Sequence, residues 1–135
     1  MTRTYIDSGV LIWAARDVGD LALRAMRILD DPQRSFASSL FVKLETLPKS
    51  AHFRRRREVE FYESYFNGCV AWARVTEALA HTALDEARHH GLAAMDALHI
   101  VSASIAEADE IVTSEKATKP IHRTDRVHVV SLRPA

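Results

Sequence analysis

Short apolar segments typical of strands alternate with longer segments typical of helices, and this alternation limits the folds open to the chain. The strand-like segments are 4–6, 35–37, 69–72, 110–114 and 127–132, and the helix-like segments are 10–13, 21–29, 40–47, 54–65, 78–89 and 91–105. Strands that alternate with helices favour a parallel sheet covered on both faces. We therefore predict an α/β fold with three layers, α/β/α, around a parallel sheet of about five strands.

Particular residues mark where these helices begin and end. Pro32 closes the helix 21–29, and Ser38 or Ser39 can cap the helix that follows. That helix is expected to end before Pro48, because the residue before a proline is displaced from helical geometry. Gly91 is well placed as the C-terminal cap of the helix 78–89.

Length and composition predict one domain spanning residues 1–135. Hydrophobic residues make up 47% of the 135 residues, which suffices for one continuous core. No segment approaches the roughly 20 apolar residues of a membrane span, and no apolar secretory segment opens the chain. The one cysteine, Cys69, cannot form an internal disulfide or a thiolate zinc site. We expect a soluble, cytoplasmic protein with no membrane partner.

Two acidic residues stand in apolar surroundings. Asp7 follows the strand-like segment 4–6, and Asp96 is the only charged residue in the helix-like run 91–105. In open α/β sheets, ligands bind beyond the carboxyl ends of the strands, so Asp7 is a candidate to hold a metal ion or a phosphate. Each acid also has a simpler interpretation, as the N-cap of a helix.

Two further acids complete a predicted cluster: Glu45, after the second strand, and Glu115, after the fourth. The first and fourth strands are natural neighbours at a topological switch point, so their carboxyl ends would converge. Carboxylates about 4 Å apart repel by roughly 4 kcal/mol at an effective dielectric near 20, so the cluster calls for a cation. Oxygen ligands favour Mg²⁺ or Mn²⁺, which act on phosphates. Phosphodiester hydrolysis is the matching reaction. Considered without the other acids, Glu45 is more simply a solvated helix residue.

Four pieces of sequence around these acids carry a family pattern: Tyr5–Leu11 (YIDSGVL), Glu45, Met95–Ala103 (MDALHIVSA) and Ile111–Glu115 (IVTSE). Over nearly its whole length the chain resembles a PIN domain of the VapC-type toxin ribonucleases of toxin–antitoxin systems. The resemblance implies a PIN-like fold and a metal-dependent endoribonuclease that cleaves single-stranded RNA with Mg²⁺ or Mn²⁺. Asp7, Glu45 and Asp96 would be the catalytic metal ligands, with Glu115 assisting. A homodimer and a cognate antitoxin that covers the acidic pocket are also implied.

Two positions depart from the family pattern. Glu115 stands where the family most often has aspartate, so its carboxylate is one methylene longer and is expected to reach the metal through water. Gly9 replaces a common Asn or Ser and removes one hydrogen bond to the first carboxylate or its water. A catalytically silent PIN-fold module that binds RNA or protein is therefore the alternative function. A phosphotransferase with Asp7 as nucleophile is disfavoured, since such enzymes usually carry a second Asp at the position of Gly9.

Contacts to RNA must come from a local patch, because eighteen basic residues balance eighteen acidic ones. Lys116, Lys119 and Arg123 lie in the polar loop after the fourth strand and are the preferred contacts to the RNA backbone. Ser8 and Thr113, the polar neighbours of the acids, are expected to bind substrate as well.

Other polar and aromatic residues have two interpretations. The run Arg54–Arg57 could grip phosphates, but it is more simply the solvated start of a helix. His99 lies three residues after Asp96 and could position a water or a phosphate, but it more simply packs beside the site with one ring nitrogen hydrogen-bonded. An aromatic stripe could pack in the core or form a dimer or antitoxin interface; it consists of Phe61, Tyr62, Tyr65 and Phe66.

Overall fold

A five-stranded parallel sheet forms the centre of the protein in the computed structural model, which describes residues 1–134. The strands are β1 (Thr2–Ile6), β2 (Arg34–Ser39), β3 (Ala71–Ala73), β4 (Glu110–Thr113) and β5 (His128–Ser131). They lie in the order β3-β2-β1-β4-β5, and each neighbouring pair is parallel. The predicted α/β class and parallel sheet are confirmed, and β1 and β4 are neighbours as expected.

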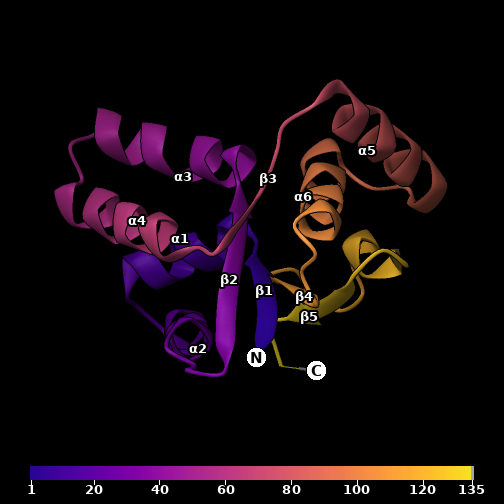
Figure 1. Cartoon of the computed structure of the whole chain (residues 1–135). Coiled ribbons are helices and arrows are strands. Elements are labelled where there is room, and N and C mark those ends of the chain that lie inside the picture. The colour runs from indigo at the N-terminus through magenta and orange to yellow at the C-terminus, as the bar shows by residue number, and fades with distance from the viewer. Residues whose placement is uncertain (135) are drawn as a thin grey trace.

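Helices cover both faces of this sheet. They are α1 (Ser8–Arg16), α2 (Asp20–Leu29), α3 (Leu40–His52), α4 (Arg56–Gly68), α5 (Glu77–His90), α6 (Ala94–Ile105) and a short 3₁₀ helix, η1 (Pro120–Arg123). Helices α1 to α4 lie on one side of the sheet, and α5 and α6 lie on the other (Figure 1). Within residues 1–134, none of these helices combines the length and apolar character that crossing a membrane requires.

The central strands β1 and β4 place apolar residues where both faces of the sheet are covered. Tyr5 and Ile6 of β1 and Ile111 and Val112 of β4 are fully buried. Parallel strands between two helical layers need such continuous apolar runs, since neither face meets water. The burial fixes the paired carboxyl ends of β1 and β4 side by side, in the register Ile6 to Val112.

The helix boundaries confirm one prediction and correct another. Gly91 ends α5 with a left-handed φ of 68°, as a C-terminal cap does. The expected end of α3 before Pro48 is wrong, because α3 continues through this proline to His52. Its buried face, Val42, Thr46 and Ser50, repeats every four residues, and packing of this face carries the helix past the proline.

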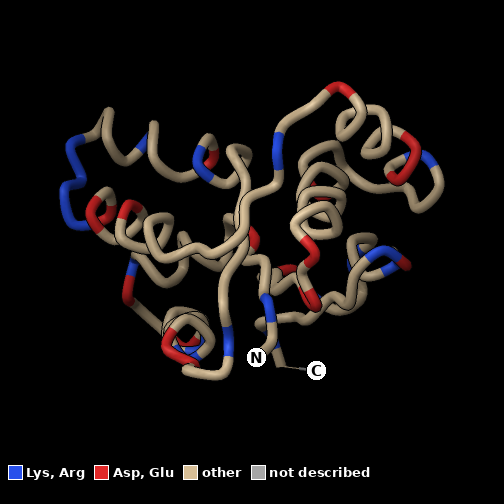
Figure 2. The backbone as a smooth tube through the Cα atoms, viewed as in Figure 1, with Lys and Arg blue, Asp and Glu red and all other residues tan. Residues whose placement is uncertain are grey.

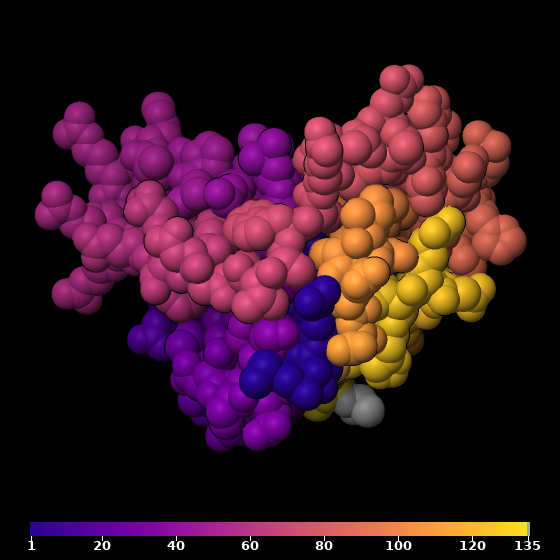
Figure 3. Space-filling model, in the orientation of Figure 1, coloured from indigo at the N-terminus to yellow at the C-terminus, as the bar shows by residue number. Residues whose placement is uncertain are grey.

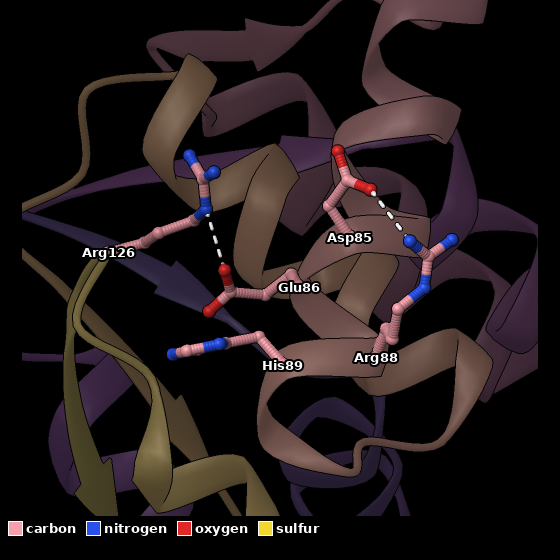
Figure 4. A pocket seen from close by; sticks show the side chains of 5 residues that line it. All are labelled: Asp85, Glu86, Arg88, His89 and Arg126. Atoms are coloured by element: carbon pink, nitrogen blue, oxygen red, sulfur yellow. Dashed lines mark hydrogen bonds and ion pairs between the residues drawn. The ribbon is translucent and has the colours of Figure 1, made fainter.

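Hydrogen bonds to Glu86 hold the segment before β5 against α5. Its carboxylate accepts hydrogen bonds from Thr124 Oγ1 at 2.6 Å and Arg126 Nε at 2.8 Å, and His90 Nε2 lies 3.5 Å away. Burial acts to raise the pKa of Glu86, but the hydrogen bonds and the charges of Arg126 and His90 outweigh it and hold the pKa below its usual value. The surrounding shallow pocket is lined by the pairs Arg126–Glu86 and Arg88–Asp85 (Figure 4).

Glu86→Gln is expected to lower the free energy of unfolding by about 1–2 kcal/mol at neutral pH, because charge-assisted hydrogen bonds are lost. The pKa of Glu86 is lowered on folding, so the wild-type advantage is complete above the usual glutamate pKa and is lost as the pH falls through the lowered value. Urea unfolding at neutral and acid pH measures this difference. The neighbouring exposed Asp85→Asn serves as the control and should change little; a deficit in Glu86→Gln that persists unchanged in acid would contradict the assignment.

Candidate active site

Asp7 occupies the turn between the central strand β1 and α1. Its Oδ1 accepts a hydrogen bond from the Ser8 amide at 2.8 Å, and its Oδ2 accepts one from Thr113 Oγ1 at 3.0 Å. The side chain is nearly buried, and this burial raises the pKa of Asp7, with the charge of Glu45 adding to the rise. The charge of His99 and the two hydrogen bonds act in the opposite direction without cancelling it. Asp7 also stands at the N-cap position of α1, so both sequence interpretations apply to it.

Glu45 reaches the same place from α3 and is tied to a buried histidine. Its Oε1 accepts a hydrogen bond from Ser8 Oγ at 2.7 Å and lies 2.5 Å from His99 Nε2. The hydrogen bond with His99 is the largest influence on Glu45 and lowers its pKa. His99 Nε2 also lies 3.7 Å from Asp7 Oδ1, so this one nitrogen stands between two acids.

A chain of hydrogen bonds leads from Glu45 into the core. His99 Nδ1 lies 2.8 Å from the Tyr5 hydroxyl, which lies 2.7 Å from Ser39 Oγ. Burial raises the pKa of Tyr5, so its hydroxyl keeps its proton. The Nε2 of His99 carries the proton of its hydrogen bond to Glu45, because an ionised carboxylate can only accept. Ser39 stands at the N-cap position of α3 but makes no side-chain capping bond, since its hydroxyl faces Tyr5.

Asp96 and Glu115 complete the group of acids. Ala93 is the N-cap of α6, which puts Asp96 in the first turn, so the interpretation of Asp96 as a cap is wrong. Burial raises the pKa of Asp96, and the charges of Asp7, Glu115 and Glu45 each raise it further, against the charge of His99. The charges of the other three acids therefore all act on Asp96, and the charge of Glu45 also acts on Asp7. The amide of Glu115 donates to Thr113 Oγ1 at 3.2 Å, which ties this residue to the support of Asp7.

The carboxylate oxygens of this group are suitable ligands for a hard divalent cation. In this structure, however, they are not arranged around a common point. Carboxylate oxygens are the ligands that Mg²⁺ and Mn²⁺ prefer. Among residues 1–134, however, no set of three or more His, Cys, Asp or Glu side chains is arranged as a metal site. Glu45 instead binds His99 and Ser8, and Asp7 binds Ser8 and Thr113. Three acids would share one cation only after these side chains turn.

Ser8 and Thr113, predicted to bind substrate, support the acids in this structure. The amide of Ser8 holds Asp7 while its hydroxyl holds Glu45, and Thr113 donates to Asp7. Packing accounts for the glycine at position 9, which the family pattern did not suggest. A Cβ added at Gly9 would lie 2.5 Å from Ser114 Oγ. The absence of a side chain at Gly9 therefore makes room for Ser114.

The basic residues predicted to meet RNA are spread over the region after β4. Lys116 and Lys119 are exposed, with no ion pair inside the described part of the chain. Arg123 lies on η1 and donates to the carbonyl oxygen of His90 at 3.0 Å, so its guanidinium serves the contact with α5. The run Arg54–Arg57 is exposed where α4 begins, and Figure 2 shows it as a continuous basic stretch at one end of the molecule.

Sequence reasoning missed how His99 and Tyr5 serve the site. Both ring nitrogens of His99 are hydrogen-bonded, not one, and the residue is 1% exposed. The spacing of His99 one turn after Asp96 was the available signal, since it puts both on the same helix face. Nothing in the sequence marked Tyr5, because tyrosine is common in strands and the partners of its hydroxyl lie 34 and 94 residues along the chain. The aromatic stripe lies mostly in the core, with Tyr62 and Phe66 buried.

Asp96→Asn is expected to raise the free energy of unfolding of the metal-free protein by up to about 1 kcal/mol at neutral pH. The pKa of Asp96 is raised on folding, so its charge opposes folding above that pKa, and the gain disappears once the pH falls below the usual aspartate pKa. Urea unfolding in EDTA measures this, with Asp30→Asn on the exposed turn after α2 as the control. A loss of stability in Asp96→Asn would show that Asp96 is a structural residue.

Comparison with solved structures supports the fold described above. No family model matches the sequence, and no curated protein matches it. A chain of VapBC2 from Rickettsia felis, bound to a promoter DNA fragment, has a TM-score of 0.71 at 12% identity, over 96% of this chain and 98% of the other. DNA-bound VapBC from Salmonella typhimurium gives 0.70 at 13%, over 98% and 100%. VapBC-1 from nontypeable Haemophilus influenzae gives 0.63 at 11%, over 97% and 98%. The chain therefore has the fold of chains in VapBC structures, the PIN-like three-layer fold that its sequence resembles.

Proposed function

We propose that this protein is a metal-dependent endoribonuclease that cleaves single-stranded RNA, and that it acts as the toxin of a toxin–antitoxin pair. The observation that carries the proposal is the group of four acids, Asp7, Glu45, Asp96 and Glu115, brought from four separate elements to the carboxyl ends of β1 and β4. The repulsion between such carboxylates makes the cluster unfavourable unless a cation binds between them. Acids with shifted pKa values also cluster at functional sites. The likeness to chains of VapBC structures supports the assignment as a PIN-type toxin.

Asp7, Glu45 and Asp96 would hold Mg²⁺ or Mn²⁺, with Glu115 assisting. A divalent cation at this place supplies a Lewis acid for the phosphodiester and lowers the pKa of water. Ser8 and Thr113 keep the carboxylate of Asp7 in one orientation through their hydrogen bonds. Tyr5 and His99 do the same for Glu45, because the imidazole is fixed from its other nitrogen. These contacts hold the acids in the metal-free protein, and the side chains of Asp7 and Glu45 would have to turn from them to share a cation.

The protein partner is proposed from the solved structures. All three are structures of VapBC proteins, and two of them are bound to DNA. We propose that this chain likewise pairs with a cognate antitoxin that covers the acidic site, and that it forms a homodimer.

One observation favours a second candidate, a PIN-fold module that binds RNA without cutting it. No set of three or more potential ligands is arranged as a metal site in the part of the chain that the structure describes. A protein that has lost its catalysis would keep the fold and the RNA surface but would not gather its acids around a cation.

Cleavage of a mixed set of single-stranded RNAs separates the two candidates. Purified protein is incubated with Mg²⁺, Mn²⁺ or EDTA, beside Asp96→Asn prepared identically. Cutting that requires metal and disappears in the variant is the expected result. A folded protein that binds RNA but cuts under no metal condition would support the binding module instead.

A further inference from the structure

A small basic pocket adjoins the acidic site on the side of α1, α3 and α4. It has a volume of about 180 Å³, and six of its lining residues define it here as the basic pocket: Arg16, Glu45, Lys49, Ser50, Arg55 and Tyr62. Glu45 belongs to both the acidic site and this pocket. Lys49 follows Glu45 by four residues on α3, so the two side chains lie one above the other on the same helix face.

The positive charges of the pocket are largely free for a ligand. Arg16 and Lys49 form no ion pair with any residue from 1 to 134, and Arg55 approaches Glu58 only at 3.8 Å. The two acids that line the pocket are already engaged, since Glu45 binds His99 and Ser8 while Glu58 accepts from Ser50 at 3.2 Å. Arg16 comes from α1 and Arg55 from the turn before α4, and both line the pocket together with Tyr62.

The basic surface continues away from the acidic site. A neighbouring pocket of about 470 Å³ shares Arg16 and adds Arg57 and Phe61 from α4. The turn between α3 and α4, which supplies Arg55 to the basic pocket, carries long side chains that project from this end of the molecule (Figure 3). Arg16, Arg55 and Arg57 thus line neighbouring pockets, beside the partly exposed ring of Phe61, on which a base can stack.

We propose that the basic pocket binds a backbone phosphate of single-stranded RNA next to the scissile phosphodiester. The proposal rests on the proposed nuclease function, because Glu45 lines both the acidic site and the basic pocket. Charge is the recognising feature, since the Thr46 and Ser50 hydroxyls already donate to Val42 and Glu58. Guanidinium and ammonium groups in a partly enclosed pocket can bind a phosphodiester oxygen. Such contacts do not distinguish one base from another.

Binding of a 5′-labelled single-stranded oligouridylate in EDTA tests the pocket without any cleavage. Fluorescence anisotropy over a range of salt concentrations is measured for Arg16→Gln, Lys49→Gln, Arg55→Gln and the triple variant. Each lost phosphate contact lowers the slope of log affinity against log salt by about 0.7, so each single variant should bind about fivefold more weakly near 0.1 M salt. The triple variant should lose about two in slope and about 100-fold in affinity.

Arg27→Gln, on the exposed face of α2, is the matched control and should bind like the wild type. Circular dichroism confirms that all variants fold. Wild-type affinity and slope in the triple variant would overturn the proposal. So would weaker binding of poly-glutamate with unchanged binding of RNA, which would assign the pocket to an acidic peptide.

Two further measurements separate this proposal from the nuclease function. Uridine 5′-monophosphate should shift the amide signals of Thr46 and Ser50 in an NMR titration while uridine does not; equal shifts from both would overturn phosphate recognition. Cleavage with Mn²⁺ is then compared between the wild type and the triple variant. If the wild type cuts and the variants bind normally, only the pocket proposal fails. If the variants lose RNA binding but the wild type never cuts, the pocket stands as an RNA site and only the nuclease function fails.

Discussion

Asp7→Asn is expected to reduce metal-dependent cleavage of single-stranded RNA about a thousandfold, since a catalytic cation contributes several kcal/mol to such a reaction. The amide keeps the size of the carboxylate and can still accept from the Ser8 amide, whereas its charge, the main attraction for a cation, is gone. Initial rates with Mn²⁺ on one RNA substrate measure the loss.

The same variant should stay folded, because burial already raises the pKa of Asp7 and so disfavours its charge. Its thermal midpoint should match or exceed that of the wild type. Asp30→Asn makes the same chemical change on an exposed turn and should keep full activity. An Asp7→Asn protein that cuts at the wild-type rate would remove Asp7 from the catalytic group.

His99→Ala is expected to lower the free energy of unfolding by about 2–4 kcal/mol, the range for emptying a well-packed core position and breaking its hydrogen bonds. The imidazole is buried, and it joins the Tyr5 hydroxyl at 2.8 Å to Glu45 at 2.5 Å. Its removal leaves a cavity beside Tyr5 and frees Glu45. Urea unfolding in EDTA measures the effect without interference from a bound metal.

His89→Ala is the control for this change, since His89 is exposed on α5, and it should alter stability by less than about 0.5 kcal/mol. His99→Gln keeps one hydrogen-bond donor and one acceptor and should recover part of the loss. Equal stability of His99→Ala and the wild type would mean that the Tyr5–His99–Glu45 connection does not support the fold.

The order of strands and helices could be predicted because it depends on local patterns. The segment that ends at Ile6 and the segment 110–113 predict buried parallel strands. The general rule that ligands bind beyond the carboxyl ends of such strands then points to the turn after β1. The end of α3 was missed for the opposite reason. Pro48 is a local signal for a helix end, but packing of a separate helix, α4, against Ser50 overrides it.

The acids could be proposed from sequence because each stands at a place that the fold brings to one edge of the sheet. Their supporting contacts could not, since they depend on side chains far apart in the chain. Glu45 and His99 are 54 residues apart, and Thr113 is 106 residues from Asp7. The close approach of Ser114 that explains Gly9 is likewise a property of packing between α1 and the end of β4.

A titration with Mn²⁺, followed by NMR, tests most directly the claim that the acids at the carboxyl ends of β1 and β4 hold a divalent cation. Paramagnetic broadening should begin at the amides of Ser8, Asp96 and Glu115 and should be lost in Asp7→Asn. Broadening centred elsewhere, such as the histidines His89 and His90 at the end of α5, or none at all, would contradict the account.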